Sequence, residues 1–124
     1  MRMGIERINL ENLPRAGNYS HAIVAGNTVY LSGQLGINPE TKGNFRKQFE
    51  TAMVNAEKIL KSSGSSLDHV IRVVVYLSSA SNFQEMNQLF DSYFKGRAPA
   101  RTTIICGFVN PDALVELEVT AFKS

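Results

Sequence analysis

The feature that most constrains the fold is the segment VIRVVVYL at residues 70–77. It is nearly continuous in apolar, mostly β-branched residues, which is typical of a strand buried on both faces of a sheet. Two helices cover about one face of a sheet of this size. The other face needs a second cover. Since monomers seldom expose large apolar patches, we expect another copy of the chain to supply it.

The remaining sequence alternates between strand and helix patterns. Apolar residues recur every three or four positions over 45–62 and again from Phe83 until near Lys95-Gly96, as in amphipathic helices. Ser81 and Gln84 predict a capping box for the second helix. Further strands are expected at 5–10, 19–25, 28–32, 102–108 and 114–122, with a Gly26-Asn27 hairpin turn and a break at 33–36. The predicted fold is α+β in one domain over residues 1–124, in the order β-β-β-α-β-α-β-β.

Composition excludes several classes of function. The formal charge is +2 and the densest basic patch is only Arg46-Lys47, which argues against nucleic acid as the main partner. Cys106, the single cysteine, excludes an internal disulfide, and with only His21 and His69 beside it no zinc-type ligand cluster is predicted. The N-terminus lacks a signal-peptide pattern and no apolar run approaches membrane-spanning length. We therefore expect a soluble cytoplasmic protein without a membrane partner.

Charged residues inside apolar strands mark the segment from Pro99 to Glu118 as the candidate site. Arg101 heads one predicted strand, and Glu116 and Glu118 share one face of the next, because strand side chains alternate between faces. A short turn at 110–112 predicts that the two strands are antiparallel neighbours.

Two interpretations of these charges stay open. Arginine presents a planar fork that matches a carboxylate, so Arg101 is suited to hold a small carboxylate substrate. A glutamate in partly apolar surroundings has a raised pKa and can exchange protons with water or substrate. Alternatively, Arg101 forms an ion pair with Glu116 or Glu118 across the strands, which is the more common arrangement on spacing alone.

Other residues offer weaker signals. Tyr19 is either a hydrogen-bond donor to a ligand or an aromatic cap at a sheet edge. His21 is expected to be a partly exposed strand residue rather than a base, since it has no obvious orienting partner. Ser32 and Gly33 form either a backbone donor site at a strand end or an ordinary turn. Cys106 lies in an apolar run and is expected to serve packing.

Four stretches carry a resemblance to a known family: GNYSHA at 17–22, LSGQ at 31–34, Met86-Asn87, and the pair PAR at 99–101 with VELE at 115–118. The chain resembles the RidA/YjgF family of reactive-intermediate deaminases, also labelled endoribonuclease L-PSP. The resemblance implies a chorismate-mutase-like mixed sheet with two helices packed on one face. It also implies a homotrimer with sites between subunits. The implied reaction is hydrolysis of enamines and imines, such as 2-aminoacrylate or 2-iminopropanoate, to 2-keto acids and ammonia without a metal or organic cofactor.

The resemblance also assigns roles. It implies that Arg101 binds the substrate carboxylate and that Glu116 handles the attacking water and the proton transfers. Substrate contacts are expected from a further set: Tyr19, Ser32, Gly33, Asn87 and Thr103. Thr103 stands where many deaminase-active relatives carry cysteine, and His21 stands where glutamine is common. The alternative function is a non-catalytic binder of small 2-keto or amino acids that uses the same pocket.

Overall fold

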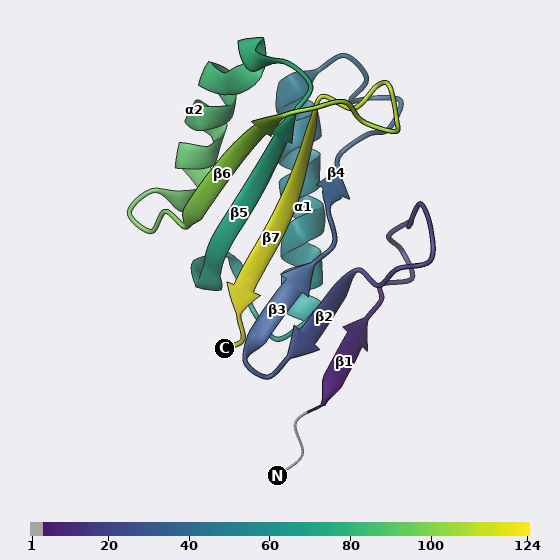
Figure 1. Cartoon of the computed structure of the whole chain (residues 1–124), viewed down its shortest axis with the longest axis vertical. Coiled ribbons are helices and arrows are strands. Elements are labelled where there is room, and N and C mark those ends of the chain that lie inside the picture. The colour runs from purple at the N-terminus through teal and green to yellow at the C-terminus, as the bar shows by residue number, and fades with distance from the viewer. Residues whose placement is uncertain (1–3) are drawn as a thin grey trace.

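The computed structural model describes residues 4–124 and shows one mixed sheet with two α-helices (Figure 1). The helices are α1 (Phe45–Ser62) and α2 (Phe83–Phe94). The strands are β1 (Ile5–Ile8), β2 (Ala22–Ala25), β3 (Thr28–Leu31), β4 (Gln34–Leu35), β5 (Val70–Leu77), β6 (Ala100–Ile105) and β7 (Val115–Phe122). Two short 3-10 turns are η1 (Leu67–His69) and η2 (Ala80–Asn82). The predicted α+β class and the bounds of α1 and β5 are confirmed.

The sheet is arranged around β5 and β7. Its order is β1-β2-β3-β7-β5-β6, and β4 pairs with β7 beyond the end of β3. β7 runs antiparallel to β3, β4 and β5, whereas β5 and β6 are parallel. The parallel pair follows from the helix between the two strands, because a parallel connection needs a crossover of a dozen or more residues.

Two predictions about strands are wrong. β6 and β7 are not neighbours, because β5 lies between them and pairs with both. Residues 106–114 cross over the end of β5 instead of turning tightly, which a short turn signal does not reveal (Figure 1). Residues 33–36 were expected to interrupt the strand and lie in a loop. Gln34 and Leu35 instead pair with Leu117 and Glu116 and form β4.

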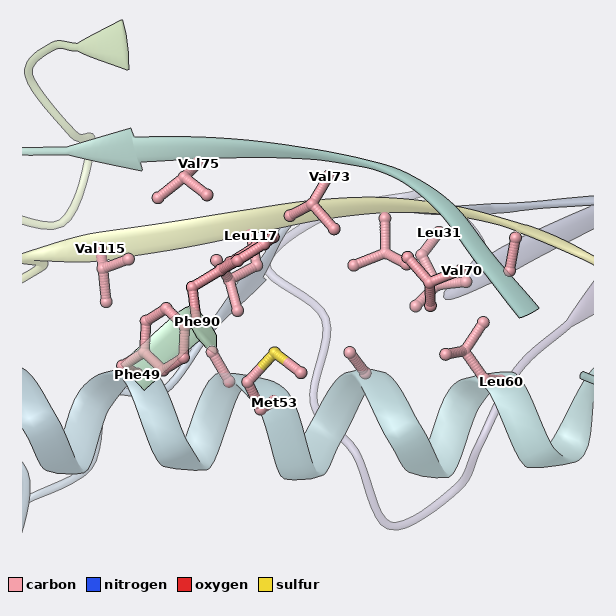
Figure 2. Close-up of a cluster of buried hydrophobic side chains, with 14 of the residues drawn as sticks. Leu31, Phe49, Met53, Leu60, Val70, Val73, Val75, Phe90, Val115 and Leu117 are labelled. Carbon is pink, nitrogen blue, oxygen red and sulfur yellow. The ribbon is translucent and has the colours of Figure 1, made fainter. Parts of the chain in front are cut away.

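The core lies between the sheet and α1, with α2 completing it at the β6 edge (Figures 1 and 2). Phe49 and Met53 project from α1 toward Leu117 and Val73 of the sheet (Figure 2). Each of these four side chains is at most 2% exposed. Burying one side chain of this size contributes about 1.5–3 kcal/mol to the free energy of unfolding. These residues therefore determine which face of the sheet points toward the helices.

The face of the sheet opposite the helices, called the open face below, is left uncovered by residues 4–124. On β5 the residues Val73 and Val75 are buried, while Arg72 is exposed and Val74 half-buried. The single chain thus covers β5 on the helix side alone, and the expectation that a second copy buries the other face stays a prediction. Large apolar side chains remain exposed on the open face, among them Tyr30 (51%), Ile104 (39%) and Phe122 (47%).

The second helix begins differently from the prediction. Asn82 is its N-cap and makes no side-chain capping bond, so the capping box from Ser81 to Gln84 is wrong. Ser81 belongs to η2, where its N–H donates to the Ser79 hydroxyl oxygen at 3.2 Å. The 3-10 turn already directs the chain into α2. No helix within residues 4–124 is long and apolar enough to cross a membrane.

Candidate active site

Five of the seven predicted site residues line one of two separate clefts of one chain. The Glu116 cleft, of about 650 Å³, is lined by Tyr19, Gly33 and Glu116 together with neighbours from the 13–21 loop, β4, α1 and the 108–110 loop. The Arg101 cleft, of about 590 Å³, is lined by Asn87, Phe90, Arg101 and four neighbours from α2 and the segment before β6. In Figure 1 the segments of the Glu116 cleft lie on the right, whereas β6 and α2 lie on the left.

Glu116 is held in the middle of the sheet. It lies on β7 between Leu35 of β4 and Tyr76 of β5. Burial raises the pKa of its carboxyl group above the ordinary range, and the nearby negative charge of Glu118 adds to the shift. None of the protein groups in the described chain forms a hydrogen bond or ion pair with this carboxylate by the usual distance criteria. Its oxygens are thus available to a ligand.

The Glu116 carboxylate lies so close to Gly33 that only a residue without a side chain fits there. A Cβ atom added at Gly33 would collide with Oε2 of Glu116 and lie 2.8 Å from its Cδ. A side chain at this position therefore displaces the glutamate. The structure brings together two residues that the sequence predicted separately, one from a strand end and one from the interior of β7.

Tyr19 borders the same cleft from the 13–21 loop. Its phenolic oxygen accepts the N–H of Ala16 at 3.0 Å, which leaves its own proton free to donate. The Arg15 guanidinium donates to the Tyr19 carbonyl at 2.8 Å and fixes the loop. Ser32 has a structural contact instead: its hydroxyl donates to the Ser20 carbonyl at 2.6 Å, and it is not among the residues that line the cleft.

Arg101 packs on the helix side of β6. Its guanidinium carbon lies 4.8 Å from the centre of the Phe90 ring and 5.9 Å from that of Phe83, and Nη1 lies 3.7 Å from Sδ of Met86. Such cation–π contacts orient a guanidinium without using its fork of N–H donors. Within residues 4–124 no carboxylate lies within 4.0 Å of it as an ion-pair partner. Arg101 is thus a fixed cation that is open to an anion.

The other two predicted residues lie near Arg101. Asn87 of α2 lines the Arg101 cleft. Thr103 is half-buried on β6, pairs in register with Val75, and shares the face of Arg101. These three residues form a group that is distinct from Tyr19, Gly33 and Glu116.

The two groups face opposite sides of the sheet. Arg101 pairs in register with Val73, whose side chain is in the core. Glu116 pairs in register with Tyr76 of β5. Side chains alternate along a strand, so Tyr76, three positions after Val73, points to the opposite face, which is the open face. The ion pair between Arg101 and Glu116 or Glu118 is therefore wrong within one chain. If Arg101 and Glu116 act in one site, they come from different copies.

Glu118 has a partner of its own, which the sequence did not indicate. The Tyr76 hydroxyl donates to Oε1 of Glu118 at 2.7 Å across the open face. This hydrogen bond, together with desolvation and the charge of Glu118, raises the pKa of Tyr76 to about 12. The two glutamates are thus distinguished by their contacts: Glu118 is hydrogen-bonded, and Glu116 is not.

We expect alkaline titration to detect this pair. The absorbance of the four tyrosines at 295 nm should include one transition near pH 12 that Tyr76→Phe removes. Glu118→Gln should shift that transition down toward pH 10, because the charge that opposes phenolate formation is gone. An unchanged high-pH transition in Tyr76→Phe would show that this tyrosine is not held by Glu118.

His21 differs most from its prediction. It is 1% exposed rather than partly exposed. Its ring Nδ1 accepts the N–H of Leu10 at 2.9 Å, an orienting partner eleven residues away that no local pattern reveals. His21 also lines the Glu116 cleft.

The rest of the Glu116 cleft comes from residues that the sequence did not single out. Its walls combine apolar side chains with amides, contributed by segments far apart in the chain: Leu13, Leu35, Ile37, Phe108, Val109, Asn38, Asn55 and Asn110. Only the tertiary fold joins them. In the part of the chain that the structure describes, no group of three or more His, Cys, Asp or Glu residues is arranged to hold a metal ion.

Known proteins resemble this chain over nearly its whole length. The family model described as endoribonuclease L-PSP matches residues 10–123. A RutC family protein of Pyrococcus horikoshii is 38% identical over 95% of this chain and 98% of its own length. A protein of Arabidopsis thaliana named Reactive Intermediate Deaminase A, chloroplastic, is 36% identical over 94% of this chain and 65% of its own length.

Solved structures resemble this chain in backbone, as the relatives resemble it in sequence. The crystal structure of RidA from the Antarctic bacterium Psychrobacter superposes with a TM-score of 0.85 at 33% identity, covering 94% of this chain and 98% of that one. The backbone of this chain is therefore one that known proteins share.

Proposed function

The chain belongs to the RidA/YjgF family, and from this premise we propose that it is an enamine/imine deaminase. Its substrates would be reactive intermediates such as 2-aminoacrylate and 2-iminopropanoate, and its products a 2-keto acid and ammonia. Among its relatives, the Arabidopsis protein carries a deaminase name. The residues that would perform the reaction are Arg101 and Glu116.

The observation that carries this proposal is that neither charged group has an ion-pair partner among residues 4–124. Arg101 is oriented by aromatic rings, and Glu116 lies over Gly33. Unpaired, partly buried charges cost stability and are retained where they bind or react. A guanidinium can hold the carboxylate of a 2-imino acid, and a carboxylate can take the proton of the attacking water.

The reaction follows from those two groups. The Arg101 fork holds the substrate carboxylate through paired N–H donors. An enamine first gains a proton at its terminal carbon and becomes the iminium. Glu116 then accepts a proton from water as the water oxygen bonds to C2, and the resulting carbinolamine nitrogen takes a proton and leaves as ammonia. The C2 hydroxyl loses its proton and becomes the keto oxygen. Acid–base assistance of this kind contributes about 10²–10⁴-fold.

Assembly would complete the site. We propose a homotrimer in which the open face of each subunit is covered by its neighbour, so that the Arg101 group of one copy meets the Glu116 cleft of the next. The exposed Tyr30, Ile104 and Phe122 support this arrangement, because apolar side chains gathered on one face favour a subunit interface. Opposite faces of one sheet cannot otherwise supply both groups to one substrate.

RNA is a less suitable substrate than a small carboxylate. The family description includes the word endoribonuclease. Each of the two clefts, however, is lined by one arginine and by no lysine in the described part of the chain. Binding to a nucleic-acid backbone usually relies on several cations that neutralise successive phosphates.

The experiment that tests the function generates the imine in solution. An amino-acid oxidase acting on alanine supplies 2-iminopropanoate, and semicarbazide competes with water for it. An imine hydrolase lowers the yield of semicarbazone and releases pyruvate faster than the spontaneous rate. An unchanged yield at micromolar protein, together with stabilisation by pyruvate, would favour a non-catalytic binder instead.

Light scattering tests the assembly. We expect a mass of about 41 kDa, three times the 13.7 kDa of the chain. Ile104→Glu should shift the mass toward 13.7 kDa, because it places a charge in the covered face. Val54→Glu is the matched control, since Val54 is 47% exposed on α1, away from that face. A wild-type monomer at micromolar concentration would contradict the proposed interface.

A further inference from the structure

One side of α2 is shaped around Arg101. Phe83, Met86 and Phe90 are spaced by three and four positions, so they project from the same side of the helix. The crossover from β5 through α2 to β6 brings this side against the start of β6, where Arg101 lies. The helix therefore presents two aromatic rings and one thioether to a single guanidinium.

Phe90 is the nearer of the two rings. The guanidinium carbon of Arg101 lies 4.8 Å from the centre of this ring and 5.9 Å from that of Phe83. Phe90 is 6% exposed, and its ring packs against Phe94 with the two centres 4.7 Å apart. A ring packed in the core in this way is a fixed surface. A guanidinium that lies over such a ring keeps its N–H groups at its edges, away from the ring face.

The N–H groups of Arg101 divide between the helix and the cleft. Nη1 lies 3.7 Å from Sδ of Met86, which is a weak acceptor. Within residues 4–124, Nε and Nη2 make no hydrogen bond, and even Asp91, which lines the same cleft, forms no ion pair with them. Nε–H and Nη2–H lie side by side on one edge of the guanidinium, and such an edge matches the two oxygens of a carboxylate.

We propose that Phe90 is a positioning residue, whose ring fixes the guanidinium plane so that the Nε–H and Nη2–H edge of Arg101 meets the substrate carboxylate. Phe83, which is 42% exposed, supports the same guanidinium from the rim. Without the rings the arginine samples several rotamers, and the substrate binds only to the fraction of molecules in the competent one. This inference rests on the proposed function, because it concerns the group that would hold the substrate.

Kinetics test the role of the ring. We expect Phe90→Leu to raise KM for 2-iminopropanoate about tenfold and to leave kcat within about threefold, because fewer Arg101 conformers are competent. Phe90→Tyr keeps an aromatic ring and should stay within about threefold of wild type in both constants. Phe94→Leu is the matched control. It removes a ring from the same buried pair, whereas the rings near the guanidinium are Phe90 and Phe83, so its KM should stay within about twofold.

Two results would overturn the inference. One is a Phe90→Leu protein that folds, judged by its melting temperature, and keeps the wild-type KM. The other is a rise in KM for Phe94→Leu as large as that for Phe90→Leu, which would indicate a general effect of core packing. If Phe90→Leu does not fold, Phe83→Leu decides, because this residue is partly exposed; we expect KM to rise about threefold, and an unchanged KM would refute the role of the rings.

An NMR titration separates this inference from the function itself. The Nε–H signal of Arg101, assigned by its loss in Arg101→Lys, should shift as pyruvate is added, and Phe90→Leu should raise the dissociation constant about tenfold. A wild type that binds pyruvate in this way but hydrolyses no imine would refute the function and leave the positioning role standing. Equal dissociation constants for wild type and Phe90→Leu, or no shift of the Arg101 signal, would refute the positioning role and leave imine hydrolysis to its own assay.

Discussion

Arg101→Ala is expected to lower kcat/KM for 2-iminopropanoate by about 100-fold or more. The lost group makes two charge-assisted hydrogen bonds to the substrate carboxylate, each worth about 1.5–3 kcal/mol. Most of the change should appear in KM, because the carboxylate is held alike in the ground state and in the transition state. Arg101→Lys should recover only part of the loss, since an ammonium group does not reproduce the planar fork.

The control for Arg101 is another arginine. Arg97 lies four residues earlier, is exposed, and forms an ion pair with Asp68 at 3.0 Å. Arg97→Ala should leave kcat/KM within about twofold of wild type, since surface ion pairs contribute about 0–1 kcal/mol. Equal rates of wild type and Arg101→Ala would exclude Arg101 as the carboxylate-binding group.

Glu116→Gln is expected to reduce kcat by about 10²–10⁴-fold while KM changes little. The amide is nearly the same size as the carboxylic acid but cannot take the proton of the attacking water. Glu118→Gln is the matched control on the same face of β7; its carboxylate is hydrogen-bonded to Tyr76. That variant should keep its turnover within a few-fold and shift the acidic limb of the pH profile to lower pH, because it removes a charge that raises the pKa of Glu116.

The same Glu116→Gln variant should be more stable than wild type at pH 7. A carboxyl group whose pKa is raised by folding is harder to ionise in the folded state than in the unfolded state. Ionisation therefore lowers the free energy of unfolding as pH rises from the ordinary value of 4.5 toward the raised one. The gain from glutamine should vanish below about pH 4, when both states are neutral. Melting temperatures at fixed protein concentration, from pH 4 to 8, measure it; lower stability of the variant at pH 7 would contradict the assignment.

The parts of the fold that depend on local periodicity were predictable. The apolar repeat at three and four residues gives α1 its bounds, and the run at 70–77 gives β5. Which strands lie next to each other in the sheet was harder to predict. A turn signal at Asn110-Pro111 favoured pairing of β6 with β7, but α2 makes β5-α2-β6 a parallel unit, and β7 then takes the other side of β5.

The sequence was enough to predict which residues belong to the candidate site, but not how those residues are arranged in space. The motif around Arg101 and Glu116 indicated the chemistry, whereas the side of the sheet on which each lies depends on register across β5. The fit of Glu116 over Gly33 and the burial of His21 depend on contacts between distant segments. Sequence alternation along one strand does not report such contacts.

Mixing two variants that each have a strongly reduced kcat/KM tests most directly whether each site is assembled from two copies. Arg101→Ala and Glu116→Gln subunits, unfolded and refolded together in equal amounts, form random trimers. If Arg101 comes from one subunit and Glu116 from its neighbour, about a quarter of the sites carry both native residues. We predict that the mixture recovers about a quarter of the wild-type kcat/KM. Activity no higher than that of the separate variants, in mixtures shown to exchange subunits, would place both residues of a site in one chain and contradict the account.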